Sequence, residues 1–342
     1  MNLSEYAAAG RTFVIAEIGQ AHDGSVGILH SLVEAAAGTG VDAVKFQVHI
    51  ADAESSPQEP FRVRFSHVDA TRYDYWKRME LAPDAWAQLK EKCDALGVEF
   101  LATPFSNAAV DLLEHIGVRR YKVGSGDAAN PLLLEKIART GKEVILSTGL
   151  GVLDELDAAV SLFKGRGVPH ALLQCTTRYP TAAEDVGLSW LERFRDRYDC
   201  PVGLSDHSGT IYAGLGAVAL GATAIEAHIT FDRRMFGPDA RASLTIDDFA
   251  RLVEGIRFIE QARGPGPEKT LDDAKRELRR MFGKALAANR DLPSGHVLSF
   301  DDLEGKKPAD GGIGVEELES VIGRTLVRSK QQWDFIKLDD LG

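Results

Sequence analysis

The sequence predicts an α/β fold: a (βα)8 TIM barrel followed by a small C-terminal domain built from short strands. From Phe13 to about Gly264, short and nearly all-apolar segments alternate eight times with amphipathic helical stretches. Parallel strands that are buried on both faces require such apolar segments. Eight βα units in about 250 residues match the size of a TIM barrel. A doubly wound open sheet remains the alternative, because periodicity does not show closure.

Eight segments are expected to form the barrel strands. They are FVIAEIG from Phe13, DAVKFQV from Asp42, VEFLAT from Val98, RRYKVGS from Arg119, EVILST from Glu143, HALLQC from His170, PVGLS from Pro201 and TAIEAHI from Thr223. A helical pattern follows each strand, such as SVGILHSLVEAAAGTG after the first. The predicted barrel domain therefore spans residues 1–264.

One connection interrupts this rhythm, between Val48 and Leu81. It is unusually long for a βα connection and carries two prolines and many aromatic residues. Long connections on the side where barrel strands end often have a function. A surface insertion that packs on itself is the other interpretation, and the sequence leaves both open.

A second change in pattern follows the eighth unit. Residues 265–283 begin with a Gly/Pro-rich turn, continue as a charged helix, and are predicted to be a linker. Residues 284–342 read as short strands and turns, which suits a compact domain. So small a domain is expected to lean on another surface for stability.

Composition excludes several classes of partner. The 342 residues include 40 Lys and Arg against 51 Asp and Glu, a balance that disfavours nucleic acid or an anionic membrane. Three cysteines without a close pair fit a reducing compartment, so we expect a cytoplasmic protein. The first residues lack the pattern of a signal peptide, and no stretch of about 18 apolar residues is present.

Polar residues gather where the strands end, which is where TIM barrels assemble their active sites. Buried polar groups are costly unless they are paired or bind a ligand. Their presence on all eight strands therefore favours a site. The residues are Glu17, Lys45, Gln47, Thr103, Lys122, Ser125, Ser147, Tyr179, Ser205, His207, Glu226 and His228.

Two histidines are candidates for a metal site. His207 follows the seventh strand and His228 ends the eighth, so neighbouring strands would bring them close enough for one divalent ion. Nearby Asp206, Glu226 and Glu17 favour this hypothesis, because carboxylates bind metals or orient their ligands. Two hydrogen-bonded structural histidines are the alternative.

A second group of residues suits an anion that carries a phosphate and a carboxylate. It combines lysines and hydroxyl groups with the glycines of VGSGD and STGLG, where backbone N–H groups can approach a ligand. Neither glycine run has dinucleotide or P-loop spacing, which disfavours nucleotides. Glycines in tight turns and solvated lysines are the alternative. The group consists of Lys45, Thr103, Lys122, Ser125 and Ser147.

A series of motifs runs along nearly the whole chain: FVIAEIGQAHDGS…GVDAVKFQ, FLATPFS, YKVGSGD…NPLLLEKIARTGKEVILSTG, QCTTRYPT…EDVGL, VGLSDHS and LGATAIEAHITFDR…GPDARASL. In content and order these motifs resemble the sialic acid synthase family of phosphoenolpyruvate-condensing enzymes. The C-terminal segment resembles the antifreeze-like (SAF) domain that follows the barrel in that family.

The resemblance implies condensation of phosphoenolpyruvate with a sugar aldehyde, giving a nonulosonic acid and phosphate. It implies a divalent metal on His207 and His228, with Mn2+ first and Mg2+ or Co2+ as alternatives, that polarises the aldehyde. Glu17 and Glu226 would handle protons or position water. Phosphoenolpyruvate would bind Lys45, Thr103, Lys122, Ser125, Ser147 and Ser205, and the acceptor sugar would bind Gln47, Tyr179, Asp239 and Lys307.

Family resemblance also implies a domain-swapped homodimer, in which the small domain reaches over a partner's barrel. Lys307 stands where family members commonly have an arginine near the acceptor's N-acyl group, and lysine cannot form a planar bidentate fork. Further departures concern the acceptor side, so the sugar need not be N-acetylmannosamine; a diacetamido-trideoxyhexose fits as well. They are Ala21 and Asp23 in the family's Asn-His-Asn-Gly motif, Thr177, and Ala240.

Two other functions stay open on the sequence alone. One is a different metal-dependent barrel enzyme, such as an aldolase or isomerase, that uses two histidines with another anion. The other is a non-catalytic barrel that serves as a binding or assembly subunit.

Overall fold

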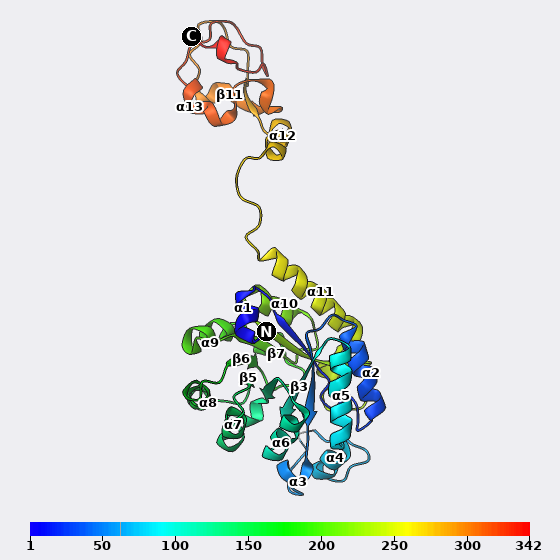
Figure 1. The fold of residues 1–342 in the computed structure, drawn as a ribbon. Coiled ribbons are helices and arrows are strands. Elements are labelled where there is room, and N and C mark those ends of the chain that lie inside the picture. Colours follow the sequence, from blue (N-terminus) through cyan, green and yellow to red (C-terminus); the bar gives the residue numbers. More distant parts are fainter. Residues whose placement is uncertain (62) are drawn as a thin grey trace. The chain divides into compact units, whose positions relative to one another are not determined.

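The protein was analysed as a computed structural model that describes residues 1–61 and 63–342. The chain divides into two compact units, Met1–Gly266 and Pro267–Gly342. Each unit has its own cluster of buried apolar side chains. Figure 1 labels their elements along the chain.

The first unit is a closed parallel barrel, as predicted. Strands β1 to β8 pair in chain order, and β1 also pairs with β8, from Phe13 opposite Ala224 to Glu17 opposite His228. This last pairing closes the barrel and excludes the open sheet. The strands are β1 (Phe13–Glu17), β2 (Ala43–Val48), β3 (Glu99–Pro104), β4 (Arg120–Val123), β5 (Glu143–Ser147), β6 (His170–Cys175), β7 (Val202–Asp206) and β8 (Ala224–Thr230), with the short β9 (Leu244–Thr245) paired to β8.

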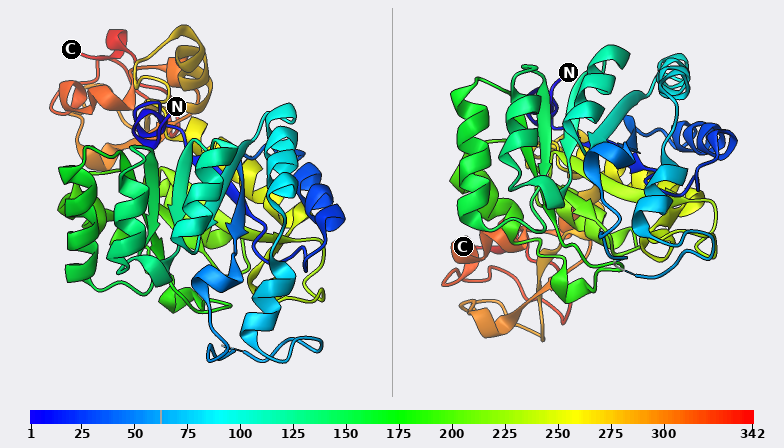
Figure 2. Two further views of the ribbon diagram at one scale, coloured as in Figure 1. Left: turned by 60° about the horizontal axis from the view of Figure 1, so that its bottom comes forward. Right: turned by 90° about the horizontal axis from the view of Figure 1, so that it is seen from below.

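Helices cover the outside of the strands, as two views in Figure 2 show. Several begin at side-chain caps: the oxygens of Ser25, Ser106 and Asn130 accept hydrogen bonds from the first turns of α2, α6 and α7. The helices of this unit are α1 (Leu3–Ala8), α2 (Val26–Ala37), α3 (Ala51–Glu54), α4 (Arg72–Met79), α5 (Pro83–Ala95), α6 (Asn107–Ile116), α7 (Pro131–Ala138), α8 (Leu153–Gly165), α9 (Trp190–Tyr198), α10 (Tyr212–Ala219) and α11 (Ile246–Ala262), with 3-10 turns η1 (Ser125–Asp127), η2 (Ala183–Asp185) and η3 (Ala240–Ala242).

The barrel interior changes from apolar to polar along the strands. Alternate residues face inward, so Phe13 and Ile15 lie in an apolar layer and Glu17 lies beyond them. The same switch occurs on β2, where Ala43 belongs to the apolar layer and Lys45 follows it. The interior layer beside the carboxyl ends of these strands is therefore polar.

The opposite end is closed by α1, which the sequence did not predict. Leu3 joins the apolar layer, and its backbone N–H donates to Glu143 over 2.8 Å. Arg120 pairs with Glu143 and with Glu99 at 2.7 Å, and also donates to the carbonyl of Met1. These contacts stabilise the barrel without contributing to the polar end.

The second unit has a small core beneath short elements. Strand β10 (Ala285–Ala288) pairs antiparallel with β11 (Leu303–Lys306). Asp302 and Asp340 are buried at matching positions, each accepting a backbone N–H three residues earlier. The other elements are α12 (Asp273–Phe282), α13 (Leu318–Val321), η4 (Phe300–Asp302), η5 (Ala309–Gly311), η6 (Val315–Glu317) and η7 (Leu338–Asp340).

The division between the units falls after Gly266, and α12 lies inside the predicted linker of residues 265–283. The antifreeze-like identity of this unit stays a prediction. Within residues 1–61 and 63–342, no helix has both the length and the apolar character needed to cross a membrane.

Candidate active site

A cavity opens at the carboxyl end of the barrel, where the sequence places the site. Glu17 lies buried below it, and Lys307 lies in the second unit. The other predicted site residues line the cavity: Lys45, Gln47, Thr103, Lys122, Ser125, Ser147, Tyr179, Ser205, His207, Glu226, His228 and Asp239.

Two lysines and two carboxylates form a charged cluster on the cavity floor. Lys45 Nζ lies 2.8 Å from Glu17 Oε2 and 3.5 Å from Glu226 Oε1. Lys122 Nζ lies 3.9 Å from the same Glu226 oxygen. All four side chains are buried, which is tolerable only because each charge has an opposite one nearby.

The pKa values in this cluster reflect both burial and pairing. Burial lowers the pKa of Lys45, but Glu17 and Glu226 more than offset it, so the pKa is raised. Lys122 has a lowered pKa, since burial outweighs the attraction of Glu226. Burial alone would raise the pKa of Glu226; Lys122 and Lys45 lower it below the usual range. The lysines therefore favour the ionised form of Glu226.

Hydroxyl groups surround the lysines. Lys45 Nζ donates to Thr103 Oγ1 over 3.2 Å, and Lys122 Nζ donates to Ser147 Oγ. Ser205 Oγ donates to Glu226 Oε1 over 2.9 Å, while Glu226 Oε2 is buried with no hydrogen-bond partner among the residues described. This oxygen is available to a ligand, a water molecule or an ion. The floor thus combines two cations, several hydroxyls and a carboxylate with one open acceptor.

The two candidate metal ligands face each other across the cavity. The rings of His207 and His228 are 5.2 Å apart, and the ring of Tyr179 is 4.2 Å from His207. Burial, followed by the charge of His228, keeps the pKa of His207 well below its ordinary value, so its imidazole is neutral near pH 7. Gly19 has φ +51°, and a Cβ there would lie 3.3 Å from both His228 Nδ1 and Glu17 Oε1. Glycine at this position leaves room beside His228.

These groups fit a metal that takes two protein ligands. Two adjacent imidazoles suit Mn, Fe, Co or Zn. Glu17 and Glu226 are held by the lysines, and Asp206 accepts hydrogen bonds from Ser208. Across 1–61 and 63–342, no set of three or more His, Cys, Asp or Glu side chains is arranged to hold a metal. The other coordination positions would belong to substrate or water.

The long connection after β2 forms one wall of the cavity. His49 follows β2 directly, with its ring stacked between Trp76 at 4.0 Å and Phe105 at 4.5 Å. Glu54 Oε1 lies 2.7 Å from His49 Nδ1. Both interpretations of this connection therefore hold: it packs on itself and it lines the site.

A chain of hydrogen bonds joins this wall to the charged cluster. His49 Nε2 lies 3.1 Å from Gln20 Nε2, and Gln20 donates to Gln47 Oε1. Gln47 Nε2 in turn donates to Glu17 Oε1 over 2.8 Å. Gln47, predicted for the acceptor, thus also orients Glu17. The sequence did not single out Gln20, His49 or Glu54 as site residues. The signal for His49 and Glu54 is the long connection in which both lie, with its many aromatic residues.

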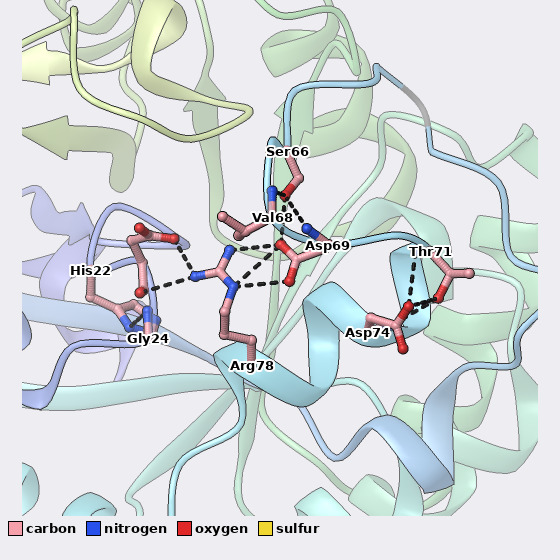
Figure 3. A network of polar contacts seen from close by, with 9 residues as sticks. His22, Gly24, Ser66, Val68, Asp69, Thr71, Asp74 and Arg78 are labelled. Carbon is pink, nitrogen blue, oxygen red and sulfur yellow. Dashed lines mark hydrogen bonds and ion pairs between the residues drawn. The ribbon is translucent and has the colours of Figure 1, made fainter.

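An arginine ties the same connection to the first βα loop. Figure 3 shows Arg78 of α4 between Asp69 and the turn that holds His22 and Gly24. Its guanidinium lies 2.8 Å from Asp69 Oδ2 and also pairs with Asp23. Gly24 has φ +77°, and a Cβ there would lie 2.7 Å from the Arg78 carbonyl oxygen. Two segments flanking the cavity are therefore fastened together.

The remaining predicted residue, Lys307, lies in the second unit. Its Nζ is 5.3 Å from the centroid of the Phe282 ring. Its contact with an acceptor sugar stays a prediction.

Comparison with known families identifies the barrel. A model described as "NeuB family" matches residues 32–268, which covers most of the barrel and all its strands except β1. The chain belongs to the NeuB family. Within this family, the chain is 33% identical to N,N'-diacetyllegionaminic acid synthase from Campylobacter jejuni.

That alignment spans 333 residues, 96% of this chain and 99% of the Campylobacter enzyme. Human N-acetylneuraminate-9-phosphate synthase is 30% identical over 328 residues, which are 95% of this chain and 91% of the human one. Among solved structures, an N-acetylneuraminic acid (sialic acid) synthetase from Leptospira borgpetersenii in complex with citrate has a TM-score of 0.68 and 33% identity. It covers 78% of this chain and 90% of its own. The predicted family is therefore confirmed.

Proposed function

We propose that this NeuB-family protein condenses phosphoenolpyruvate with a sugar aldehyde, giving a nonulosonic acid and inorganic phosphate. The observation that carries the proposal is the charged cluster at the carboxyl end of the barrel. Lys45 and Lys122 are cations held in place by carboxylates and surrounded by hydroxyl donors, an arrangement suited to an anion with a phosphate and a carboxylate. The named acid synthases among its relatives support the same reaction.

In this proposal, the two lysines bind phosphoenolpyruvate in addition to their carboxylate partners. Its phosphate and carboxylate would lie against Lys45, Lys122 and the hydroxyls of Thr103, Ser125, Ser147 and Ser205. The lysines then contact the substrate as well as Glu17 and Glu226, which lie within 4 Å of them. The carboxylates are thus next to the substrate and become available as proton acceptors.

The reaction forms one C–C bond, adds water at C2 and cleaves the C–O bond between C2 and the phosphate. The methylene carbon of phosphoenolpyruvate attacks the aldehyde carbon, whose oxygen takes up a proton, and C2 is left as an oxocarbenium-like centre. Water adds to C2 and loses its proton to a carboxylate, Glu17 or Glu226. Phosphate then leaves with the bridging oxygen by C–O cleavage as the C2 hydroxyl gives up its remaining proton, which leaves a keto group at C2. Glu226 Oε2, which has no hydrogen-bond partner among the described residues, is an acceptor suited to hold that water.

A divalent metal fits the two histidines. His207 and His228 would hold it, and when bound it supplies Lewis-acid polarisation of the aldehyde. We propose Mn2+ first, with Mg2+ or Co2+ as alternatives. Gln47, Tyr179 and Asp239 would contact the acceptor's hydroxyl groups.

The proposal extends to the second unit and to the assembly. We propose that residues 284–342 are an antifreeze-like domain, that the protein is a cytoplasmic, domain-swapped homodimer, and that Lys307 approaches the acceptor's N-acyl group. A stable and active monomer in solution would contradict the swapped arrangement, and sedimentation measures this directly.

The reaction is tested with purified protein, Mn2+, phosphoenolpyruvate and a panel of aldoses. At least one aldose should give phosphate together with a product whose mass is that of the aldose plus pyruvate. Another aldolase or isomerase would consume an aldose without phosphoenolpyruvate, and a non-catalytic barrel would consume neither. Absence of phosphate release with every aldose sinks the proposal.

A further inference from the structure

A buried histidine on the cavity wall has no part in the proposed reaction. The ring of His49 is stacked between Trp76 and Phe105, at interplanar angles of 18° and 10°. Trp76 belongs to α4 and Phe105 follows β3, so two separate elements pack on the imidazole. The side chain of His49 is only 4% exposed. The plane of the ring is therefore fixed, and with it the directions of the two ring nitrogens.

One of these nitrogens faces a carboxylate. His49 Nδ1 lies 2.7 Å from Glu54 Oε1, and Glu54 Oε2 accepts a hydrogen bond of 3.3 Å from the backbone N–H of Ile50. Glu54 is the last residue of α3, and its side chain is 7% exposed. A carboxylate beside one ring nitrogen of a histidine places the proton on that nitrogen. Glu54 therefore favours the Nδ1–H tautomer of His49.

The other nitrogen faces an amide group that can only donate. Gln20 Nε2 carries two hydrogens and has two acceptors, His49 Nε2 at 3.1 Å and Gln47 Oε1. Gln47 Nε2 donates in turn to Glu17 Oε1 over 2.8 Å, and the other oxygen of Glu17 lies 2.8 Å from Lys45 Nζ. Each contact in this series thus joins one donor to one acceptor.

The opposite tautomer of His49 would disrupt the far end of the series. A proton on His49 Nε2 would face an N–H of Gln20 and force that amide to turn over. Gln20 Oε1 would then face Gln47 Oε1, and turning Gln47 as well would set its oxygen against Glu17 Oε1. Two acceptors without a hydrogen between them lose their bond and repel each other. The tautomer of His49 and the orientation of Glu17 are therefore linked through two amides.

We propose that His49 is a positioning residue that sets the orientation of the Glu17 carboxylate. As the Nδ1–H tautomer held by Glu54, it fixes the amide of Gln20, and Gln20 fixes Gln47, which donates to Glu17. The effect on turnover rests on the proposed function, in which Glu17 is one of two carboxylates that accept the proton of the attacking water. A carboxylate turned away from that water loses its part in proton transfer.

The tautomer can be measured in the protein without any substrate. In protein labelled with 15N at histidine, the chemical shift distinguishes a ring nitrogen that carries a proton from one that does not. The signals of His49 are those missing from His49→Phe. Near neutral pH, Nδ1 should carry the proton and Nε2 should not. A proton on Nε2 overturns the proposal, whatever reaction the protein catalyses.

Kinetics test whether the series acts on turnover. His49→Phe keeps a stacked ring and removes both nitrogens, so kcat for phosphate release should fall about tenfold or more. The KM for phosphoenolpyruvate should change less than about threefold, because the lysines of the cavity floor keep their hydroxyl partners. His170→Phe is the matched control: His170 begins β6, its Nδ1 lies 2.9 Å from the Val168 carbonyl oxygen, and kcat should stay within about twofold of the wild type. A loss of kcat no larger than in this control overturns the proposal and leaves the proposed function standing.

A double-mutant cycle tests whether His49 acts through Gln20. Gln20→Met removes both N–H donors in a side chain of similar length. Adding His49→Phe to Gln20→Met should lower kcat by no more than about twofold further, because the series is already broken. Losses that multiply would show two independent supports and overturn the series. If the wild type releases no phosphate with any aldose, the proposed function fails instead, and the tautomer measurement still decides whether His49 accepts from Gln20.

Discussion

Single residues explain the chemistry of the cavity floor. Glu226 Oε1 is shared by Lys45, Lys122 and Ser205, so one carboxylate holds three donors in place. Glu17 plays the corresponding part for Lys45 and is itself oriented by Gln47. Each lysine is thus held in position by carboxylate and hydroxyl partners.

Glu226→Gln should lower kcat by about 100-fold or more, because it removes both a proton acceptor and the charge that matches two buried lysines. Glu143→Gln is a matched control: Glu143 is also a buried carboxylate on a barrel strand, paired with Arg120 at the opposite end. It should lower thermal stability and leave kcat within about twofold of the wild type. Steady-state phosphate release measures kcat for both variants. Equal losses of kcat in the two would contradict the role given to Glu226.

His207→Ala and His228→Ala should each abolish retention of Mn2+ after dialysis, since two imidazoles are the protein donors proposed for it. Bound metal is measured by elemental analysis, independently of activity. His170→Ala, at the start of β6, serves as the control and should retain the metal. Retention of one ion per chain in both cavity variants would show that the metal is held elsewhere.

Particular residues show how far the sequence predicts this site. His207, His228 and the anion group could be found because they end apolar strands, where polar residues are conspicuous. Their pairing could not: that Lys45 meets both Glu17 and Glu226 follows from the closure that sets β2 beside β1 and β1 beside β8. Periodicity within a segment carries no information about that closure.

At the scale of elements, the connection after β2 links the fold to the acceptor side. Its residues stack on His49, line the cavity, and are fastened through Arg78 to the first βα loop. The sequence marked the connection by its length and aromatic content. It did not specify α3, α4 or the Arg78 contacts, because these depend on partners far along the chain, such as Asp23.

Arg78→Met should raise the KM for the acceptor about tenfold and change the KM for phosphoenolpyruvate less than twofold. The physical reason is that the connection after β2 loses its link to the first βα loop, while Lys45 and Lys122 keep their partners. Lys90→Met, which removes an exposed i,i+4 pair with Asp94 on α5, is the control and should change neither constant. Parallel increases in both KM values would show that Arg78 supports the whole barrel instead.

At the scale of the whole molecule, the chain combines a barrel with a second unit that has its own buried charges. The eight-stranded barrel and the strand segments were predicted from the apolar pattern, and the closing β1–β8 pair confirms them. Helix α1, which closes the end of the barrel opposite the cavity, was not predicted, since six residues are too few to show a helical period. In the second unit, Asp302 and Asp340 repeat one cap, a feature that only the folded backbone makes visible.

Stability of the second unit should fall in acid. Burial would raise the pKa of Asp302, but hydrogen bonds from His296 and Ser299 and the pairing with Arg290 lower it below the ordinary value. The carboxylate therefore contributes stability above about pH 4, the unfolded pKa, and this contribution is lost as pH falls through the lower folded pKa. Asp302→Asn should reduce the unfolding temperature of this unit at pH 7 and less so at pH 3.

Calorimetry of the full chain at both pH values makes this measurement. Asp301→Asn is the control, because Asp301 is the exposed neighbour in the same turn, and it should have little effect at either pH. An Asp302→Asn deficit that is the same at pH 7 and pH 3 would contradict the assigned pKa direction.

The central claim is that this barrel cleaves the C–O bond of phosphoenolpyruvate while it joins the substrate to a sugar aldehyde. Phosphoenolpyruvate labelled with 18O at the bridging oxygen tests it directly, with mass spectrometry of both products. The account predicts that the released phosphate carries the label and that the sugar acid takes its C2 oxygen from water. Unlabelled phosphate, with 18O retained in the organic product, would contradict it.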